Sequence, residues 1–191
     1  MRRLAWMLLS VGLLAGCVTP RAPFAPLPWE QRVALLQQAM KWQLDGRAAA
    51  AIGTQGWQAD LSWSQIQATS EVHLAGPLGL GAQALRLTPA GLFVNGAPAG
   101  EEVVAQLQDR VGFQLPLTQL RYWLLGVPDP GAPFTLVRNA QDRAQRLEQA
   151  GWAVDYDLYE QTDGDWLPRN LVLTRESVRV RIVIDHWSFE R

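Results

Sequence analysis

Alternation of apolar and polar residues is the dominant pattern of the chain from Trp42 onward. Trp57, Leu61 and Trp63 alternate with polar residues, and the same pattern recurs in shorter runs as far as Ile184. A period of two places one face of a strand against the core and the other against water. Many such strands joined by turns predict antiparallel sheet with one apolar face.

Helical periodicity occurs in three segments, 29–42, 101–111 and 116–125. In each, apolar residues return after three or four positions, which places them on one face of a helix. The second segment begins with acidic residues, as the helix dipole favours, and the third begins at a proline and is followed by Gly126. We therefore predict three helices among the strands.

A sheet with one wet face needs cover on its other face. The predicted fold class is mainly β with α (α+β): a strongly curved antiparallel sheet, forming an incomplete (half-open) β-barrel covered by short helices. The apolar positions expected inside, as a solid core or as the wall of a hydrophobic cavity, are Trp57, Leu61, Trp63, Leu74, Leu85, Leu87, Leu117, Leu120, Leu124, Trp152, Tyr156, Leu158, Leu173, Val180 and Ile182. Periodicity alone leaves both interpretations open.

Residues 1–16 have the pattern of a signal peptide, with two arginines, an apolar run and small residues before Cys17. The run is too short to serve as a stop-transfer helix. Its end, Leu14-Ala15-Gly16-Cys17, resembles the lipobox of bacterial lipoproteins. Cys17 is the only cysteine, so it has no intramolecular disulfide partner. The alternative is a soluble secreted protein whose signal peptide ends beside a cysteine.

By this resemblance, Cys17 carries an N-acyl chain and an S-diacylglycerol, and we expect no other cofactor. Several acyl chains, at ~0.8 kcal/mol per buried methylene, give stable membrane attachment. Val18 stands where lipoproteins of the inner membrane often have Asp, so we expect the outer membrane of a Gram-negative bacterium, facing the periplasm. We interpret the proline-rich residues 17–28 as a tether between anchor and domain. We interpret residues 29–191 as a single domain.

Charge and side-chain chemistry argue against several other classes of protein. The 17 basic and 18 acidic residues are nearly balanced and form no basic patch, so nucleic acid is not an expected partner. His73 and His186 have no partners at catalytic or metal-ligand spacing, so we predict neither an enzyme nor a metal site. Acidic residues around 155–165 lack the spacing of a calcium loop and are interpreted as a solvated turn.

The loop from Gly76 to Gly81 is punctuated like a turn but carries Leu78 and Leu80. Short loops lie on the surface, because burial would leave their backbone groups without partners. The two leucines either fold back to cap the core or project toward something apolar. Both interpretations remain open at this point.

Several of these runs together resemble one family, the outer-membrane lipoprotein receptors called LolB. They are the lipobox, the loop Gly76-Pro77-Leu78-Gly79, the run from Leu115 to Pro128, and the closing strand from Arg179 to Trp187. The match follows the order of nearly the whole chain. Its most specific part is Pro116-Leu117-x-x-Leu120-Arg121-x-Trp123-Leu124-x-Gly126.

The resemblance implies a half-barrel with a hydrophobic cavity for the acyl chains of other lipoproteins. It also implies a periplasmic carrier, LolA, that delivers the lipid-modified N-termini, and insertion into outer-membrane phospholipid without nucleotide hydrolysis. A loop leucine needed for insertion falls by motif on Leu78, beside Pro77 and Leu80, and Leu80 departs from the small polar residue usual there. We expect a monomer.

Two other functions are compatible with the residues. The first is a structural or assembly lipoprotein of the outer membrane, with a solid β core and a protein partner bound at its surface. The second is a lipocalin-like binder of small molecules. Only the carrier and the small-molecule binder need an internal cavity.

Overall fold

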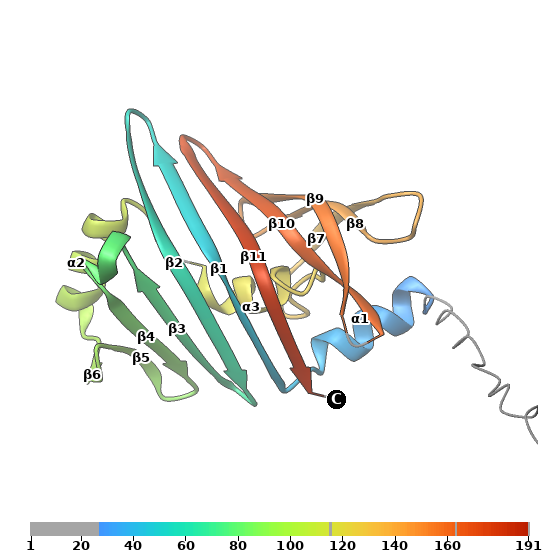
Figure 1. Cartoon of the computed structure of the whole chain (residues 1–191), viewed down its shortest axis with the longest axis horizontal. Helices are drawn as coiled ribbons and strands as arrows, with labels where there is room; N and C mark the ends of the chain where they lie inside the picture. The colour runs from blue at the N-terminus through green and yellow to red at the C-terminus, as the bar shows by residue number, and fades with distance from the viewer. Residues whose placement is uncertain (1–26, 115, 163, 191) are drawn as a thin grey trace, which may run out of the picture.

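The computed structural model describes residues 27–114, 116–162 and 164–190. In these ranges the chain forms three α-helices, one 3-10 turn and eleven strands (Figure 1). The helices are α1 (Trp29–Gln37), α2 (Glu101–Val111) and α3 (Leu117–Trp123), with the turn η1 (Pro77–Gly79). The strands are β1 (Lys41–Ile52), β2 (Gln55–Ile66), β3 (Thr69–Ala75), β4 (Gln83–Thr88), β5 (Gly91–Val94), β6 (Ala97–Pro98), β7 (Phe134–Arg138), β8 (Ala144–Gln149), β9 (Trp152–Thr162), β10 (Asp165–Arg175) and β11 (Val178–Glu190).

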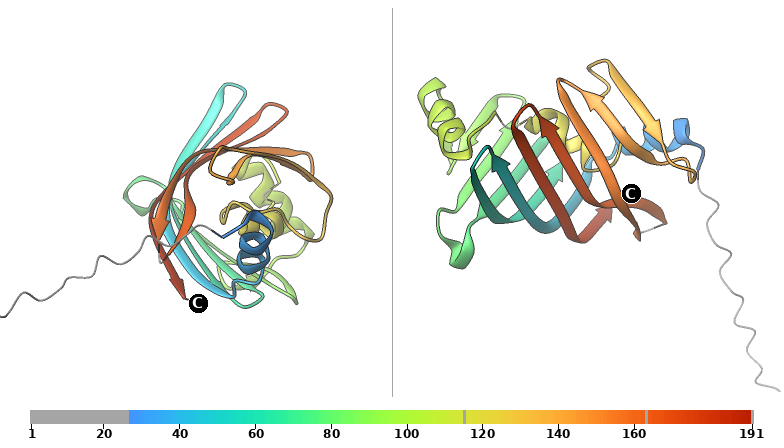
Figure 2. Two further views of the ribbon diagram at one scale, coloured as in Figure 1. Left: turned by 90° about the vertical axis from the view of Figure 1, so that its right-hand side faces the viewer. Right: turned by 90° about the horizontal axis from the view of Figure 1, so that it is seen from above.

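All these strands belong to one antiparallel sheet, in the order β6-β5-β4-β3-β2-β1-β11-β10-β9-β8-β7. Strands β6 and β7 form its two edges and do not pair with each other, so the sheet is open. The end-on view in Figure 2 shows that the sheet curls around α1 and α3. The predicted half-open barrel covered by helices is therefore confirmed. No helix of the described ranges has the length and apolar character that a membrane crossing requires.

The concave face of the sheet holds large apolar side chains, including the predicted Trp63 and two tryptophans that were not among the predicted interior residues. Trp42, Trp63 and Trp187 come from three neighbouring strands and are almost fully buried. The ring of Trp42 stacks on Trp63 at 6.0 Å between centroids and meets Trp187 edge-on at 5.7 Å. Such contacts add to the stability gained from burial, and they fix the strands at this end of the half-barrel.

Leu158 is an exception, and its predicted place in the interior is wrong. It is 52% exposed, and Asp157 before it is exposed too, whereas Tyr159 is buried. The pairing between β9 and β10 shifts register opposite this point, between Pro168 and Leu171. A bulge of this kind reverses which residues face inward, and strict alternation cannot anticipate it.

The first helix is shorter than the segment 29–42 that periodicity suggests. It ends at Gln37, and Lys41 already begins β1. Met40 is therefore exposed, whereas Trp42 points into the core from the strand. The two periodicities overlap at this junction, and pairing with β2 and β11 selects the strand from Lys41 onward.

Helices α2 and α3 agree closely with the predicted segments. Strand β8 holds α3 in place through Gln149, whose amide accepts from Trp123 Nε1 at 2.8 Å and donates to the carbonyl of Asp129 at 2.8 Å. The Tyr156 hydroxyl donates to the carbonyl of Trp123 at 3.0 Å. Burial raises the pKa of Tyr156 well above its ordinary value, so the hydroxyl remains a donor.

Candidate functional site

A small apolar cavity lies between the concave face of the sheet and the helices that cover it. Its volume is about 40 Å³, and only apolar surface faces it. It is lined by Ala48, Trp57, Leu61, Trp63, Val72, Leu74, Leu85, Phe113, Pro116, Leu117, Leu120, Trp152, Leu173, Val180 and Ile182. About 10–15 Å³ of such space is needed to hold one water, so this interior has room for only a few small molecules and is largely filled by its own side chains.

Most of the predicted interior residues surround this cavity, and four do not. Leu87 lines a neighbouring pocket, Leu124 and Tyr156 are buried in the core away from the cavity, and Leu158 is exposed. Side chains that line the cavity but were not among the candidates are Ala48, Val72, Phe113 and Pro116. Alternation in β1 and β3 would have identified the first two. Phe113 and Pro116 lie between two helices, where no periodicity marks them.

The cover consists of α2, α3 and residues 112–114 and 116 between them, and no side chain of α2 lines the cavity itself. Phe113, Pro116, Leu117 and Leu120 of this cover close the cavity on the side opposite the sheet. One hydrogen bond ties the end of α2 to the sheet: Trp57 Nε1 donates to the carbonyl of Val111 at 3.0 Å. The α2 end of the cover is thus tied to the sheet by this indole bond, whereas α3 is held by the hydrogen bonds of Trp123 with Gln149 and Tyr156.

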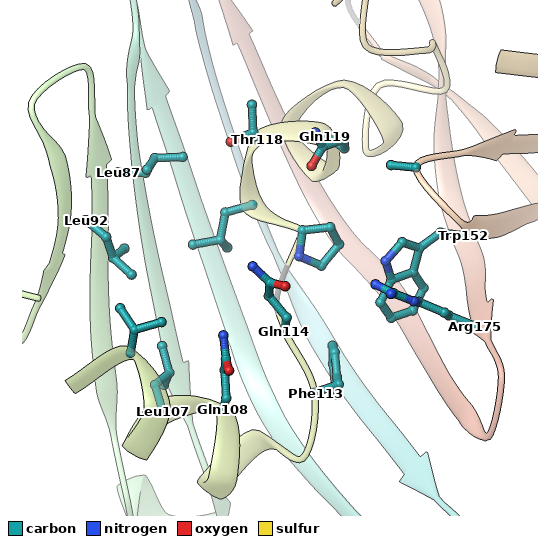
Figure 3. Close-up of a pocket in the computed structure, with 14 residues that line it drawn as sticks. Leu87, Leu92, Leu107, Gln108, Phe113, Gln114, Thr118, Gln119, Trp152 and Arg175 are labelled. Carbon is teal, nitrogen blue, oxygen red and sulfur yellow. The ribbon is translucent and has the colours of Figure 1, made fainter. Parts of the chain in front are cut away.

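A second pocket, of about 350 Å³, adjoins the cavity at the cover (Figure 3). Four residues, Phe113, Pro116, Leu117 and Trp152, line both spaces. The second pocket differs in character, because Gln108, Gln114, Thr118, Gln119 and Arg175 add polar groups to its apolar wall. The two spaces together form an apolar interior with a partly polar mouth.

The loop between β3 and β4 projects its leucines into solvent. Leu78 is 100% exposed and Leu80 is 72% exposed, so the interpretation that they cap the core is wrong. The loop is held by its own backbone, with Gly76 N donating to Leu80 O at 3.0 Å and Gly79 N to Gly76 O at 2.9 Å. Leu78 has φ 59°, a left-handed conformation that a leucine rarely adopts.

This conformation of Leu78 brings no evident benefit to folding. A left-handed conformation costs a non-glycine residue about 1–2 kcal/mol, and full exposure gives no burial in return. Strained residues of this kind are concentrated at functional sites. The same loop is adjacent to the cavity along the chain, because Leu74 lines the cavity four positions before Leu78.

The polar residues considered in the sequence have structural partners or face solvent. His73 and His186 are exposed. Asp155 receives two hydrogen bonds from Arg146 Nη1, at 2.8 and 2.9 Å, and Asp165 is paired with Arg32 at 2.9 Å. Asp163 and the lipidation candidate Cys17 lie outside the described residues. No group of three metal-binding side chains occurs among the residues that the structure describes.

The architecture defines a fold, the open half-barrel of one curved antiparallel sheet covered by helices. A solved LolA superfamily protein from Nitrosomonas europaea superposes with a TM-score of 0.54, over 86% of this chain and 94% of that one. The sequence identity is only 9%, so this likeness concerns the fold alone.

Sequence comparison identifies the family. The model of the family described as outer membrane lipoprotein LolB matches residues 40–187. A Nitrosococcus oceani protein named outer-membrane lipoprotein LolB is 36% identical over 97% of both chains. A Pseudomonas aeruginosa protein of the same name is 32% identical over 94% of this chain and 92% of its own length. The chain belongs to the LolB family of outer membrane lipoproteins.

Proposed function

We propose that the protein is anchored in the outer membrane through lipid on Cys17, facing the periplasm, and acts there as a receptor for other lipoproteins. It accepts their lipid-modified N-termini from the periplasmic carrier LolA and inserts them into the inner leaflet of the outer membrane. The process involves binding and transfer, with no chemical step. The observation that carries the proposal is a fully exposed, strained Leu78 close along the chain to a wholly apolar cavity.

The physical need for such a protein follows from the cargo. A lipoprotein anchor with several acyl chains has tens of methylenes, and at ~0.8 kcal/mol each their exposure to water would cost tens of kcal/mol. Passage from the cavity of the carrier into a second apolar cavity avoids this barrier. The direction of transfer requires that each acceptor binds the anchor more tightly than the donor.

A cavity of about 40 Å³ is far too small for an acyl chain, so cargo binding requires the cover to move. The α2 end of the cover is suited to this, because its hydrogen bond to the sheet is the one from Trp57, whereas α3 is held firmly through Trp123. Displacing the α2 end would join the cavity to the neighbouring pocket of about 350 Å³. The nearly filled interior is thus the closed state of the receptor.

The loop supplies the final step. Two exposed leucines on a short, internally hydrogen-bonded loop can enter the apolar part of a bilayer without unfolding the sheet. Such a wedge would open a path from the cavity into the leaflet. We assign the main role to Leu78 and a supporting one to Leu80 and Pro77.

Replacing Leu78 by Glu tests this assignment. The variant should fold and bind lipoprotein normally, because Leu78 makes no contact with the core, but it should no longer insert cargo into liposomes. The measurement is the fraction of labelled lipoprotein that floats with liposomes after delivery by the loaded carrier. Leu35→Glu, at an exposed leucine of α1, is the matched control and should insert at the normal rate.

Normal insertion by Leu78→Glu would refute the wedge, and equal loss in both variants would indicate a nonspecific effect of charge. The alternative of an assembly lipoprotein with a solid core is supported by the near-filled interior. It predicts that the protein does not bind a hydrocarbon probe in a saturable manner. Saturable binding would exclude it.

A further inference from the structure

The pocket beside the apolar cavity has polar side chains that the fold itself does not use. Gln108 lies on α2, Gln114 in the cover and Arg175 at the end of β10. Gln108 is half-buried, Gln114 and Arg175 are exposed to the solvent in the pocket, and none of the three forms a hydrogen bond or ion pair with another described side chain. Figure 3 shows Gln108 and Gln114 in the space between Leu107 and Trp152.

Arg175 is the only cationic side chain on this pocket's wall among the residues described. Its guanidinium carbon lies 6.0 Å from the centre of the Trp152 ring, at the edge of the range for a cation–π contact. The remaining donors of the guanidinium stay available to a ligand. The wall therefore offers two amides, which both donate and accept, and one strong donor.

These groups match the part of a lipoprotein anchor that is not hydrocarbon. A triacylated N-terminal cysteine has ester carbonyls, which only accept hydrogen bonds, and amides, which donate and accept. Its acyl chains need an apolar space, and its polar headpiece needs partners when it leaves water. Because four residues line both spaces, chains in the cavity would place the headpiece in this pocket.

We propose that Gln108, Gln114 and Arg175 form a headpiece site, which binds the ester and amide groups of the acylated cysteine. This inference rests on the proposed function and adds the recognition element that a plain apolar cavity lacks. With the site, the receptor prefers acylated cysteine peptides over lipids that present only hydrocarbon. Selectivity of this kind arises because the ester and amide groups of the peptide form hydrogen bonds with these side chains that a hydrocarbon cannot form.

The test compares two probes on the purified full-length protein. One probe is a synthetic triacylated cysteine peptide, and the other is diphenylhexatriene, a fluorescent hydrocarbon without polar groups. The variant Gln108→Leu/Gln114→Leu should bind the lipopeptide about tenfold more weakly, as expected for loss of one or two hydrogen bonds, and diphenylhexatriene as tightly as the wild type. Arg175→Met, which keeps the aliphatic part of the side chain, should also weaken lipopeptide binding and leave diphenylhexatriene binding unchanged.

Matched controls separate the site from general effects. Gln106→Leu lies on the same helix, where the exposed Gln106 donates to Glu102 at 3.4 Å and does not line the pocket. Arg179→Met removes a guanidinium from an exposed position of β11. Both controls should bind the two probes as the wild type does.

Each result has one meaning. Unchanged lipopeptide binding in the Gln and Arg175 variants would overturn the headpiece site and leave the proposed function intact. Equal loss of both probes would also overturn it, because the side chains would then support the cavity and not the headpiece. If the wild type bound neither probe, the proposed function itself would fail.

Discussion

At the scale of single residues, the most consequential interaction that sequence patterns did not indicate is a buried ion pair. Arg32 of α1 contacts Asp165 of β10 at 2.9 Å, and the two side chains are only 5% and 14% exposed. Arg32 also donates to the carbonyl of Trp166, while its Nη1 has no partner among the described residues. In the sequence, Arg32 looks like an ordinary solvated charge on a helix. The strand that buries it lies far along the chain, so no local sequence pattern indicates the burial.

Removing one partner of this pair should destabilise the protein strongly. Asp165→Asn leaves the buried guanidinium without its counter-charge, and we expect a loss of about 3 kcal/mol in the free energy of unfolding. Urea denaturation followed by tryptophan fluorescence provides the measurement. The matched control is Asp185→Asn, which breaks the exposed pair with Arg47 and should have little effect. Similar losses in both variants would contradict the role given to burial.

At the scale of elements, periodicity predicts the fold well where a strand or helix is regular. Helix α2 has the expected bounds, and the turn after β5 uses Asn95 and Gly96 with φ of 50° and 86°, as that dipeptide favours. The errors occur where regularity ends. The bulge in β9 sends Leu158 outward, and the contacts of Phe113 depend on how the cover docks on the sheet. Such features depend on tertiary packing, so local pattern does not specify them.

The hydrogen bond from Trp57 to Val111 should act as a latch on the α2 end of the cover. Trp57→Phe keeps an aromatic ring but removes the donor, and one lost bond of about 1 kcal/mol would favour the open state about fivefold. Association of diphenylhexatriene, followed by stopped-flow fluorescence, should therefore become faster by a similar factor. Trp166→Phe, a change of the same kind on β10, should leave the rate unchanged. An unaltered rate in Trp57→Phe would show that the bond does not limit opening.

At the scale of the whole molecule, one sheet carries both parts of the proposed mechanism. Its concave face forms the cavity, and the connection between β3 and β4 carries the fully exposed Leu78. The sequence indicates the half-barrel and the loop, because alternation and turn residues are local. It does not reveal that the cover closes the cavity, since closure depends on how α2 and α3 pack on the sheet.

The most direct test of the central claim is the delivery of cargo by the purified carrier. LolA loaded with a labelled lipoprotein is mixed with liposomes that contain this protein, anchored by its own lipid, and with liposomes that lack it. The account predicts that the label moves into liposomes only when the protein is present, and without added nucleotide. Label that stays with the carrier in both samples, or reaches both kinds of liposome equally, would contradict the account.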